Sequence, residues 1–577
     1  MWKYFSSFLY YVKMSLDIHK RVFLKRPIIF VILLIIAALF AAVAFYIPLC
    51  GNSFYGDDTQ VIWFAATKTT GEIFFSPENY RALSGAFFQP MLGLSFKIDW
   101  LLSGLDPKGY YIHNLLSVLF TAAAIYIFLK LYTGALPALA GSVLFLLSPV
   151  TISLFSYSTN RHYVEGMFFA ILTLYFYVKN NRGEKTNHLS SSSGNGGRWG
   201  LLILSAGSFL FSALSKEVYV LLPAIAFLIS GGNIAKRFRS TFHLWVILCL
   251  YFIWRVLMIG GIGGYPFDDL LTVRKITAGI YNLLANMPQF LFGHYSFIFW
   301  IILSAMIITA QRRNLVKTGM IVIVLLLPVL PVLTMLALDH AIARYVFHLS
   351  VFLIFTGIVW GSETMKQRGW KRILAVSMLI TVSAFFVIED NGLKQRLSRD
   401  SIAWKKTTEE FLYSGREYVK ARQPAWFYEG LGDIHEYSYG KKIRTKIVPE
   451  DNLIRYMSEE RRKEIQSAGY NVAVKNGIEI RKDVIHGTIR LDAYTMQWDF
   501  KPYTTGRYLI LKGRFSGLYD YMTPVKKKGR YLFGKYYPDS RPDLFFMRVV
   551  YQSTEGWEGI SDEYRVEVPG TYSIELK

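Results

Sequence analysis

The first 390 residues alternate between long apolar runs and short polar connections. A run of roughly 17 to 25 apolar residues is long enough for one transmembrane helix, because lipid offers the backbone no hydrogen-bond partners outside the helix itself. The pattern predicts about eleven spans, which begin near Ile28, Ile112, Leu136, Val164, Leu201, Val218, Thr241, Tyr295, Gly319, Tyr345 and Arg372. We therefore expect an all-α polytopic membrane domain over residues 28–390.

The pattern changes after Ile388. A stretch that mixes charged and apolar residues, Arg396 to Lys420, predicts a helix, and later segments rich in β-branched and aromatic residues predict strands. Those segments are Arg507 to Lys512, Leu544 to Tyr551 and Thr571 to Leu576. Residues 391–577 are thus expected to form a soluble domain that starts helical and continues β-rich, compatible with a sandwich. We expect it to act as a lid or as an acceptor-binding module.

Basic residues in the connections predict the orientation. Four short loops between spans are rich in Lys and Arg, which places them in the cytoplasm by the positive-inside rule. These loops hold Arg182, Lys185 and Arg198; Lys236, Arg237 and Arg239; Arg312, Arg313 and Lys317; and Lys366, Arg368, Lys371 and Arg372. Residues 1–27, basic and aromatic, are predicted to be a cytoplasmic interfacial segment. An odd number of spans then places both the long loop 51–111 and residues 391–577 outside.

Composition supports this assignment. The chain has 577 residues, of which 53% are hydrophobic and 18% charged, so it carries too much apolar surface for a soluble globule of that size. The net charge is +23, and the Lys and Arg residues lie mostly between apolar runs or in the last third of the chain. Membrane topology therefore explains much of the positive charge, and nucleic acid is not expected as a partner. With Cys50 and Cys249 as the two cysteines, a disulfide framework is not expected.

The first outside loop carries the most informative residues. Asp57 and Asp58 follow the first span closely, and adjacent carboxylates near a membrane surface are costly unless they are solvated, paired or used. An exposed loop pair is the plain alternative. Four basic residues, Arg81, Arg161, Lys216 and Arg344, fall at or near the same predicted face. A Lys or Arg at membrane depth costs on the order of 2.5 to 3.5 kcal/mol on insertion scales, so each should pair or bind something.

Each basic residue also has a structural alternative. Lys216 adjoins Glu217, which can neutralise it. Arg344 has Asp339 as a salt-bridge partner in reach, and Arg161 can extend to the interface from a very short loop. The histidines, His113 among them, make no local zinc motif, so no metal site is predicted. A divalent ion shared with Asp57 or Asp58 remains an open alternative that the chemistry does not require.

Several ordered motifs resemble the GT-C glycosyltransferases, and especially the bacterial relatives of the TPR-containing O-mannosyltransferase and protein O-mannosyltransferase group. The motifs are the Asp57-Asp58 pair, Gln89-Pro90-Met91-Leu92, Gly104 to Tyr110, His113-Asn114, Ser215-Lys216-Glu217 and Ala343-Arg344-Tyr345. The resemblance covers about residues 28–390. Gln89, Tyr111 and Ala343 depart from the family pattern, in which Arg, His and an acidic residue are common at these places, and no TPR repeat follows.

The resemblance implies transfer of a sugar from a polyprenyl-phosphate donor, with inversion, to a glycan, lipid or protein acceptor at the outer face. Asp57 is the favoured general base and Asp58 the alternative. The residues implied in binding donor phosphate or substrate are Arg81, Arg161, Lys216, Glu217, Arg344, Tyr345 and His113. The lipid-linked sugar is a substrate, and no cofactor is expected. The implied location is a bacterial inner membrane, with the N-terminus cytoplasmic and the C-terminal domain periplasmic.

Two other hypotheses remain open from sequence. The chain can be a lipid or glycan transporter whose first-loop carboxylates bind substrate or a coupling ion, although hydropathy gives no paired inverted repeat and few charges lie mid-span. It can also be a membrane assembly protein whose outside domain does the binding. Alanine at Asp57 should then be harmless.

Overall fold

The computed structural model describes most of the chain. The described residues are 39–260 apart from 84–86, 187–194 and 231–232; 291–301; and 343–576 apart from 367–368, 421, 424, 449–450, 471–477, 483, 492–494, 514, 520, 526, 533–542 and 569–571, with a few isolated positions elsewhere. The predicted interfacial segment 1–27, the predicted span from Gly319, the start of the span from Ile28 and most of the span from Tyr295 lie outside the described residues.

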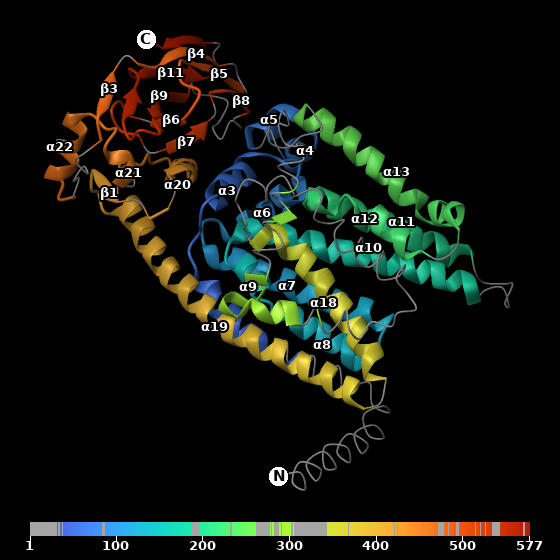
Figure 1. Ribbon diagram of the computed structural model, residues 1–577. Helices are drawn as coiled ribbons and strands as arrows, with labels where there is room; N and C mark the ends of the chain where they lie inside the picture. The colour runs from blue at the N-terminus through green and yellow to red at the C-terminus, as the bar shows by residue number, and fades with distance from the viewer. Residues whose placement is uncertain are drawn as a thin grey trace, which may run out of the picture.

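The part of the chain before residue 414 is helical (Figure 1). Its elements are η1 (Ala42–Tyr46), η2 (Ile47–Gly51), α3 (Asp58–Thr67), α4 (Thr70–Phe75), α5 (Pro77–Leu83), α6 (Pro90–Ser103), α7 (Pro107–Lys130), α8 (Ala135–Leu146), α9 (Pro149–Phe155), η3 (Ser158–Asn160), α10 (Arg161–Thr186), α11 (Asn195–Ser215), η5 (Glu217–Tyr219), α12 (Leu222–Ile229), α13 (Ile234–Ile259), η7 (Gly293–Tyr295), α18 (Ala343–Met365) and α19 (Trp370–Tyr413).

Several of these helices can cross a membrane. Within the described residues, four helices are long and apolar enough, namely α7, α13, α18 and α19, and the pair α8 and α9, bent by 49°, makes up to five if counted as one span. Helices also occupy the predicted spans near Val164, Leu201 and Val218. These helices confirm an integral membrane protein of mainly helical fold, while the predicted total of about eleven spans remains a prediction.

The predicted outside loop 51–111 is itself folded into short helices. Thr69 and Glu72 form a capping box at the start of α4, with each side chain bonded to the other residue's backbone. Pro90 opens α6, and Asp106 caps α7 by accepting from the backbone N–H of Lys108 at 3.0 Å. These local signals turn a long connection into a packed layer, which fixes the positions of side chains at the adjoining ends of the spans.

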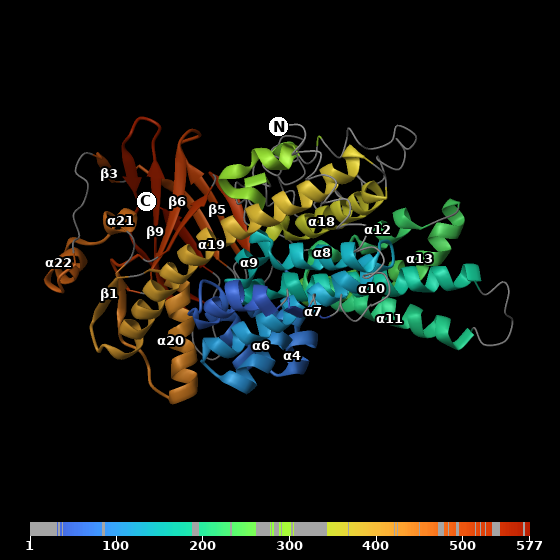
Figure 2. The ribbon, with the colours of Figure 1, turned by 90° about the horizontal axis from the view of Figure 1, so that it is seen from below.

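One long helix links the apolar bundle to the C-terminal domain. α19 has 44 residues, which at 1.5 Å per residue is about 66 Å, roughly twice the thickness of the hydrocarbon core of a bilayer. It continues without a break past position 390, where the sequence pattern changes. Figures 1 and 2 show it running along the bundle and ending beside the C-terminal domain.

The C-terminal domain is β-rich, as the sequence predicts. Its elements are β1 (Tyr418–Lys420), α20 (Ala425–Tyr439), β2 (Lys446–Val448), α21 (Asp451–Ile454), α22 (Glu459–Ser467), β3 (Ile480–Lys482), β4 (His486–Leu491), β5 (Thr495–Lys501), β6 (Arg507–Gly513), β7 (Tyr521–Val525), β8 (Lys528–Leu532), β9 (Asp543–Gln552), β10 (Glu558–Ile560), β11 (Tyr564–Val568) and β12 (Tyr572–Leu576). The three predicted strand segments correspond to β6, β9 and β12.

Two antiparallel-rich sheets pack face to face in this domain. One has the order β3-β10-β9-β6-β7, with β11 also paired to β9, and the other has the order β12-β4-β5-β8. Ile489 and Phe500 from the smaller sheet share a core cluster with Ile510 and Val549 from the larger one. This arrangement is a β-sandwich.

The larger sheet is also covered on its other face, which explains the unbroken apolar run in β6. Tyr508 and Ile510 face the smaller sheet, whereas Leu509 and Leu511 belong to a second cluster with Tyr456, just after α21. Alternate residues of a strand point to opposite faces, so burial of both faces requires apolar residues at every position.

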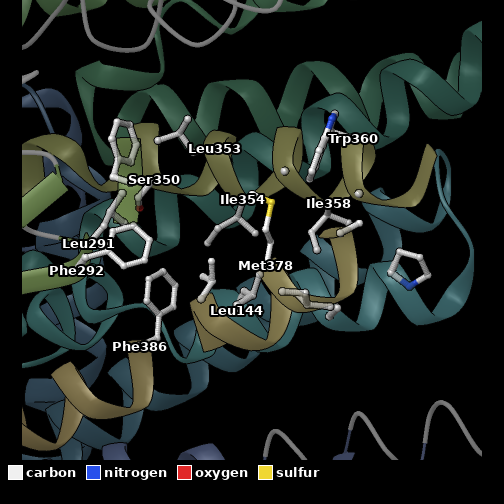
Figure 3. Close-up of a pocket in the computed structure, with 18 of the residues that line it drawn as sticks. Leu144, Leu291, Phe292, Ser350, Leu353, Ile354, Ile358, Trp360, Met378 and Phe386 are labelled. Carbon is white, nitrogen blue, oxygen red and sulfur yellow. The ribbon is translucent and has the colours of Figure 1, made fainter. Parts of the chain in front are cut away.

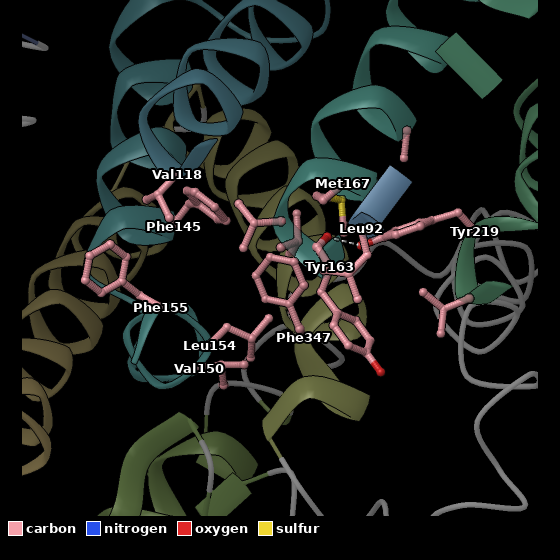
Figure 4. Packing of buried hydrophobic residues seen from close by; sticks show 14 of the residues in the cluster. Leu92, Val118, Phe145, Val150, Leu154, Phe155, Tyr163, Met167, Tyr219 and Phe347 are labelled. Carbon is pink, nitrogen blue, oxygen red and sulfur yellow. Dashed lines mark hydrogen bonds between the residues drawn. The ribbon is translucent and has the colours of Figure 1, made fainter. Parts of the chain in front are cut away.

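The helical part has one continuous core (Figure 4). Tyr163 and Phe347 lie in it, and the Tyr219 hydroxyl donates to the backbone carbonyl of Tyr163 at 2.5 Å. Tyr163 and Tyr219 come from α10 and η5, and Phe347 from α18, so this core fixes the relative positions of helices that are distant in sequence.

Candidate active site

The Asp57-Asp58 pair sits in a tight turn at the start of α3. Gly56 has φ +53°, a left-handed conformation that glycine adopts without strain. Asp57 follows at the N-cap position and is exposed, whereas Asp58 is fully buried. The two carboxylates therefore occupy different environments, and only that of Asp57 is open to a substrate.

Asp58 anchors this turn to the rest of the protein. One carboxylate oxygen accepts from the backbone N–H of Tyr55 at 2.9 Å, and the other accepts from that of Thr159 at 2.8 Å, in the connection between α9 and α10. Burial raises the pKa of Asp58 to about 6, although these backbone hydrogen bonds oppose the rise. Of the two predicted bases, Asp58 is thus the one that holds its neighbour in place.

Activity should therefore depend on pH through Asp58. As the pH falls through about 6, Asp58 becomes protonated, and one of its two oxygens can no longer accept from a backbone N–H. We expect kcat/KM for the reaction proposed below to rise with pH, with a midpoint near 6, and to level off above it. Residual activity of Asp58→Asn should show no such step. A wild-type profile that is flat between about pH 5 and pH 8 would contradict this role.

A cluster of cations lies next to Asp57. Arg344, at the start of α18, interacts electrostatically with Asp57, Tyr163 and Tyr345. Lys216, only 7% exposed, interacts with Arg344 and Tyr345, and its ammonium group lies 5.3 Å from the centroid of the Tyr163 ring. The structure thus brings together Asp57, Lys216, Arg344 and Tyr345 from three separate segments.

Glu217 holds Lys216 and the adjoining loop in position. Its carboxylate pairs with Arg255 of α13 at 2.6 Å and with Lys216 at 3.6 Å, and it accepts from the backbone N–H of Phe88 at 2.8 Å. Lys216 also donates to the Gln89 side chain at 3.2 Å. The predicted Lys216–Glu217 pair exists, but Arg255 makes the shorter contact with Glu217, so Lys216 is incompletely neutralised.

Arg161 and His113 belong to a separate buried network. The Arg161 side chain is fully buried and pairs with Asp99 at 2.5 Å, and Glu165 lies 3.4 Å from its Nε. His113 contacts the same two carboxylates, at 2.7 Å from Asp99 and 3.5 Å from Glu165. From the sequence, Arg161 could extend to the interface. The structure instead pairs it inside the bundle, where it stabilises contacts among α6, α7 and α10.

Arg81 caps a helix. Its Nε donates to the carbonyl of Met258 at 2.9 Å, and its Nη2 approaches the carbonyl of Leu257 at 3.4 Å, both in the last turn of α13. A cation there satisfies carbonyls that have no partner within the helix and interacts favourably with its dipole. We therefore do not include Arg81 among the residues proposed to bind the donor.

Sequence reasoning missed Asp99, Glu165 and Arg255. Each lies in a helix and is only slightly exposed or buried, and each pairs with a residue from another helix: Asp99 with Arg161, Glu165 with His113 and Arg255 with Glu217. For Glu165 and Arg255 the available signal was a charged residue within a predicted span, since such residues are costly unless they are paired. Asp99 lies in the predicted outside loop and gave no such signal.

An apolar cavity opens in the membrane part beside α18 (Figure 3). Its empty volume is about 960 Å³, and its lining comes from α8, α18, α19 and residues 291–299. Leu144, Phe292, Ile354 and Phe386 are among the lining side chains, and Gly357 leaves space at the wall, because a Cβ built there would meet nothing within 4 Å. Ser350, which also lines the cavity, is six residues from Arg344, about 9 Å along the helix.

Within the described residues, no group of three or more His, Cys, Asp or Glu side chains is arranged to hold a metal ion. Asp57 and Asp58 do not form such a group with other ligands there.

Comparison with known proteins identifies no family from sequence. No protein-family model matches the chain, and no curated protein matches it. Among solved structures, it is similar to ArnT from Cupriavidus metallidurans in the apo state, with 11% identity and a TM-score of 0.43, over 73% of this chain and 86% of that one. ArnT bound to undecaprenyl phosphate gives 14% identity and a TM-score of 0.36, over 66% and 78%.

The oligosaccharyltransferase of Archaeoglobus fulgidus, in a complex with Zn and sulfate, gives 12% identity and a TM-score of 0.41 over 63% of this chain. The similar region covers 52% of that protein, so this chain spans about half of its length. At these TM-scores the similarities do not decide the family or the activity of this chain.

Proposed function

We propose that the protein is a GT-C-type membrane glycosyltransferase that transfers a sugar from a polyprenyl-phosphate donor to an acceptor at the outer face of the membrane. The observation that carries the proposal is the juxtaposition of an exposed carboxylate, Asp57, with the basic residues Lys216 and Arg344. These residues lie at the outer ends of apolar helices, where the phosphate of a membrane lipid would meet a hydroxyl nucleophile.

The residues have distinct chemical tasks in this proposal. Asp57 takes the proton from the acceptor hydroxyl as its oxygen attacks the anomeric carbon of the sugar. The bond between that carbon and the phosphate oxygen breaks, and its electron pair leaves with the lipid phosphate. Because attack and departure occur on opposite sides, the anomeric configuration inverts. Lys216 and Arg344 stabilise the negative charge that grows on the phosphate.

The charge balance of the cluster supports an anionic ligand. Lys216 and Arg255 share the carboxylate of Glu217, and Arg344 interacts with that of Asp57, so in these contacts three basic groups stand against two carboxylates. The Nε atom of Arg344 is buried and has no hydrogen-bond partner in the described part of the chain. Buried cations in excess of acidic partners are costly, and a phosphate group would compensate them.

The apolar cavity next to α18 supports a lipid-linked donor. A polyprenyl chain is a branched hydrocarbon that needs an apolar path, and the cavity begins about 9 Å along the helix from Arg344. We place the donor phosphate at Arg344 and its first isoprene units in this cavity.

Filling the cavity should weaken donor binding. Gly357→Leu would project a side chain into space that is open at present, so we expect the KM for the donor to rise about tenfold while kcat with saturating donor changes little. Gly207→Leu, also at an open position but in α11, is the matched control and should leave KM unchanged. Equal effects of both variants would exclude the cavity as the path of the donor chain.

The proposal is tested with purified protein in detergent, a panel of labelled polyprenyl-phosphate sugars and membrane extract as the source of acceptors. Movement of label from lipid to a non-lipid or larger lipid product supports a glycosyltransferase. Failure with every donor, together with translocation of lipid or glycan by the same protein in liposomes, would replace it with the transporter hypothesis.

A further inference from the structure

The loop that carries Asp57 is held by segments far away in the sequence. The backbone N–H of Ser53 donates to the Ser401 hydroxyl of α19 at 2.8 Å, and the Tyr111 hydroxyl donates to the carbonyl of Ser53 at 3.1 Å. The Tyr55 ring lies 4.2 Å from that of Trp404, also in α19. The loop thus has little regular structure of its own and takes its shape from these contacts.

Gln423 makes the most specific of these contacts. Its side-chain amide donates to the carbonyl of Phe54 at 3.1 Å, and its amide oxygen accepts from the backbone N–H of Gly56 at 3.1 Å. The side chain is only 5% exposed. It therefore satisfies two buried backbone groups on either side of Tyr55, and the second of them belongs to the residue immediately before Asp57.

Gln423 belongs to the C-terminal part of the chain. It lies between β1 and α20, and α20 packs directly on α3, the helix that Asp57 caps. There the Thr59 hydroxyl donates to the carbonyl of Phe427 at 2.9 Å, and Gly430 approaches Thr59 so closely that a Cβ would lie 2.8 Å from the hydroxyl oxygen. The C-terminal part thus contacts the turn and the first turn of α3 together.

We propose that Gln423 is a positioning residue for Asp57, so that the C-terminal domain completes the active site instead of serving only as a separate lid or acceptor-binding module. The catalytic part of this proposal rests on the proposed function, in which Asp57 is the general base. The structural part, that Gln423 holds residues 54–56, does not depend on any activity. Loss of the amide would leave both backbone groups without partners, and the turn would sample other conformations. A displacement of about 1 Å in a catalytic group can lower a rate by about 10².

The test uses full-length protein with Gln423→Met, which keeps the length of the side chain and removes both hydrogen bonds. Gln466→Met is the control, since Gln466 is an exposed glutamine in α22 of the same domain. Hydrogen exchange measured by mass spectrometry should become faster in peptides covering residues 52–60 and stay unchanged in those covering β6 and β9. With the donor found above, kcat should fall about 10- to 100-fold at an unchanged donor KM, whereas the control should match wild type.

The outcomes separate this proposal from the proposed function. Unchanged exchange at residues 52–60 in Gln423→Met would overturn the positioning role directly. Faster exchange with an unchanged kcat would overturn it for catalysis, and a raised donor KM at constant kcat would assign Gln423 to donor binding instead. If wild-type protein transfers no sugar, the proposed function fails, and faster exchange would still show that Gln423 holds the loop.

Discussion

Asp57→Asn should lower the rate of sugar transfer by about 10² to 10⁴ without loss of donor binding, because general-base catalysis typically contributes that much and an amide cannot accept the proton of the acceptor. The substitution keeps the size of an exposed side chain at the N-cap of α3, where asparagine is also a favourable residue. The fold should therefore be retained. The measurement is single-turnover transfer from a labelled donor, with the donor Kd measured separately.

Glu78→Gln supplies the control for this variant. Glu78 is an exposed acidic residue in α5, in the same outer layer, so its replacement removes a similar charge without touching the Asp57 turn. It should transfer sugar at the wild-type rate. If Asp57→Asn also transfers sugar at that rate, the first-loop carboxylate is not the base and the mechanism proposed here is wrong.

The second large effect is expected at Arg344. Arg344→Gln removes a fixed cation from the place where the leaving phosphate gains charge, and loss of one such group typically lowers kcat by about 10² to 10³. Donor binding should weaken as well, because the phosphate is charged before the reaction. We expect a lower kcat and a higher donor KM together, in contrast to the pure kcat effect of Asp57→Asn.

Arg81→Gln is the matched control for Arg344→Gln. Both arginines lie in the helical part and were implied in donor binding by the same resemblance, but Arg81 caps α13. Its replacement should lower the free energy of unfolding by about 1 kcal/mol and leave the donor KM unchanged. Were Arg81→Gln to raise the donor KM while Arg344→Gln did not, the donor phosphate would have to be placed at α13 instead of α18.

The elements of this fold were the most predictable part from sequence. The apolar run from Ile112 and the segment at Leu544 to Tyr551, rich in β-branched and aromatic residues, each carry their own signal, and they form α7 and β9. Local signals suffice for such elements because the length of an apolar run and the alternation of side chains are properties of the segment itself. Asp57 and Asp58 were also found from sequence, since they directly follow a span.

The partners of the site residues could not be predicted in the same way. Arg161 and Lys216 look alike in sequence, as basic residues at the ends of apolar runs. Asp99 pairs with Arg161 inside the bundle, whereas Lys216 shares Glu217 with a third residue, Arg255. These differences arise from which helices pack together, and single-sequence periodicity carries no information on that.

The contact between the C-terminal domain and the Asp57 loop could not be predicted from sequence for a similar reason. Gln423 lies 367 positions from Gly56 in the chain, and nothing in its sequence surroundings sets it apart from a surface glutamine. The division of the chain at position 390 by composition also separates α19 into two parts, although it forms one helix that carries Ser401 and Trp404 to the Asp57 loop.

The central claim is tested most directly by the product balance of wild-type protein at single turnover. With a labelled polyprenyl-phosphate sugar and a membrane acceptor, we expect one polyprenyl phosphate to be released for every sugar that appears in the acceptor, with the anomeric configuration inverted. Release of sugar to water alone, retention of configuration, or movement of intact donor across a liposome membrane without release of polyprenyl phosphate would contradict the account.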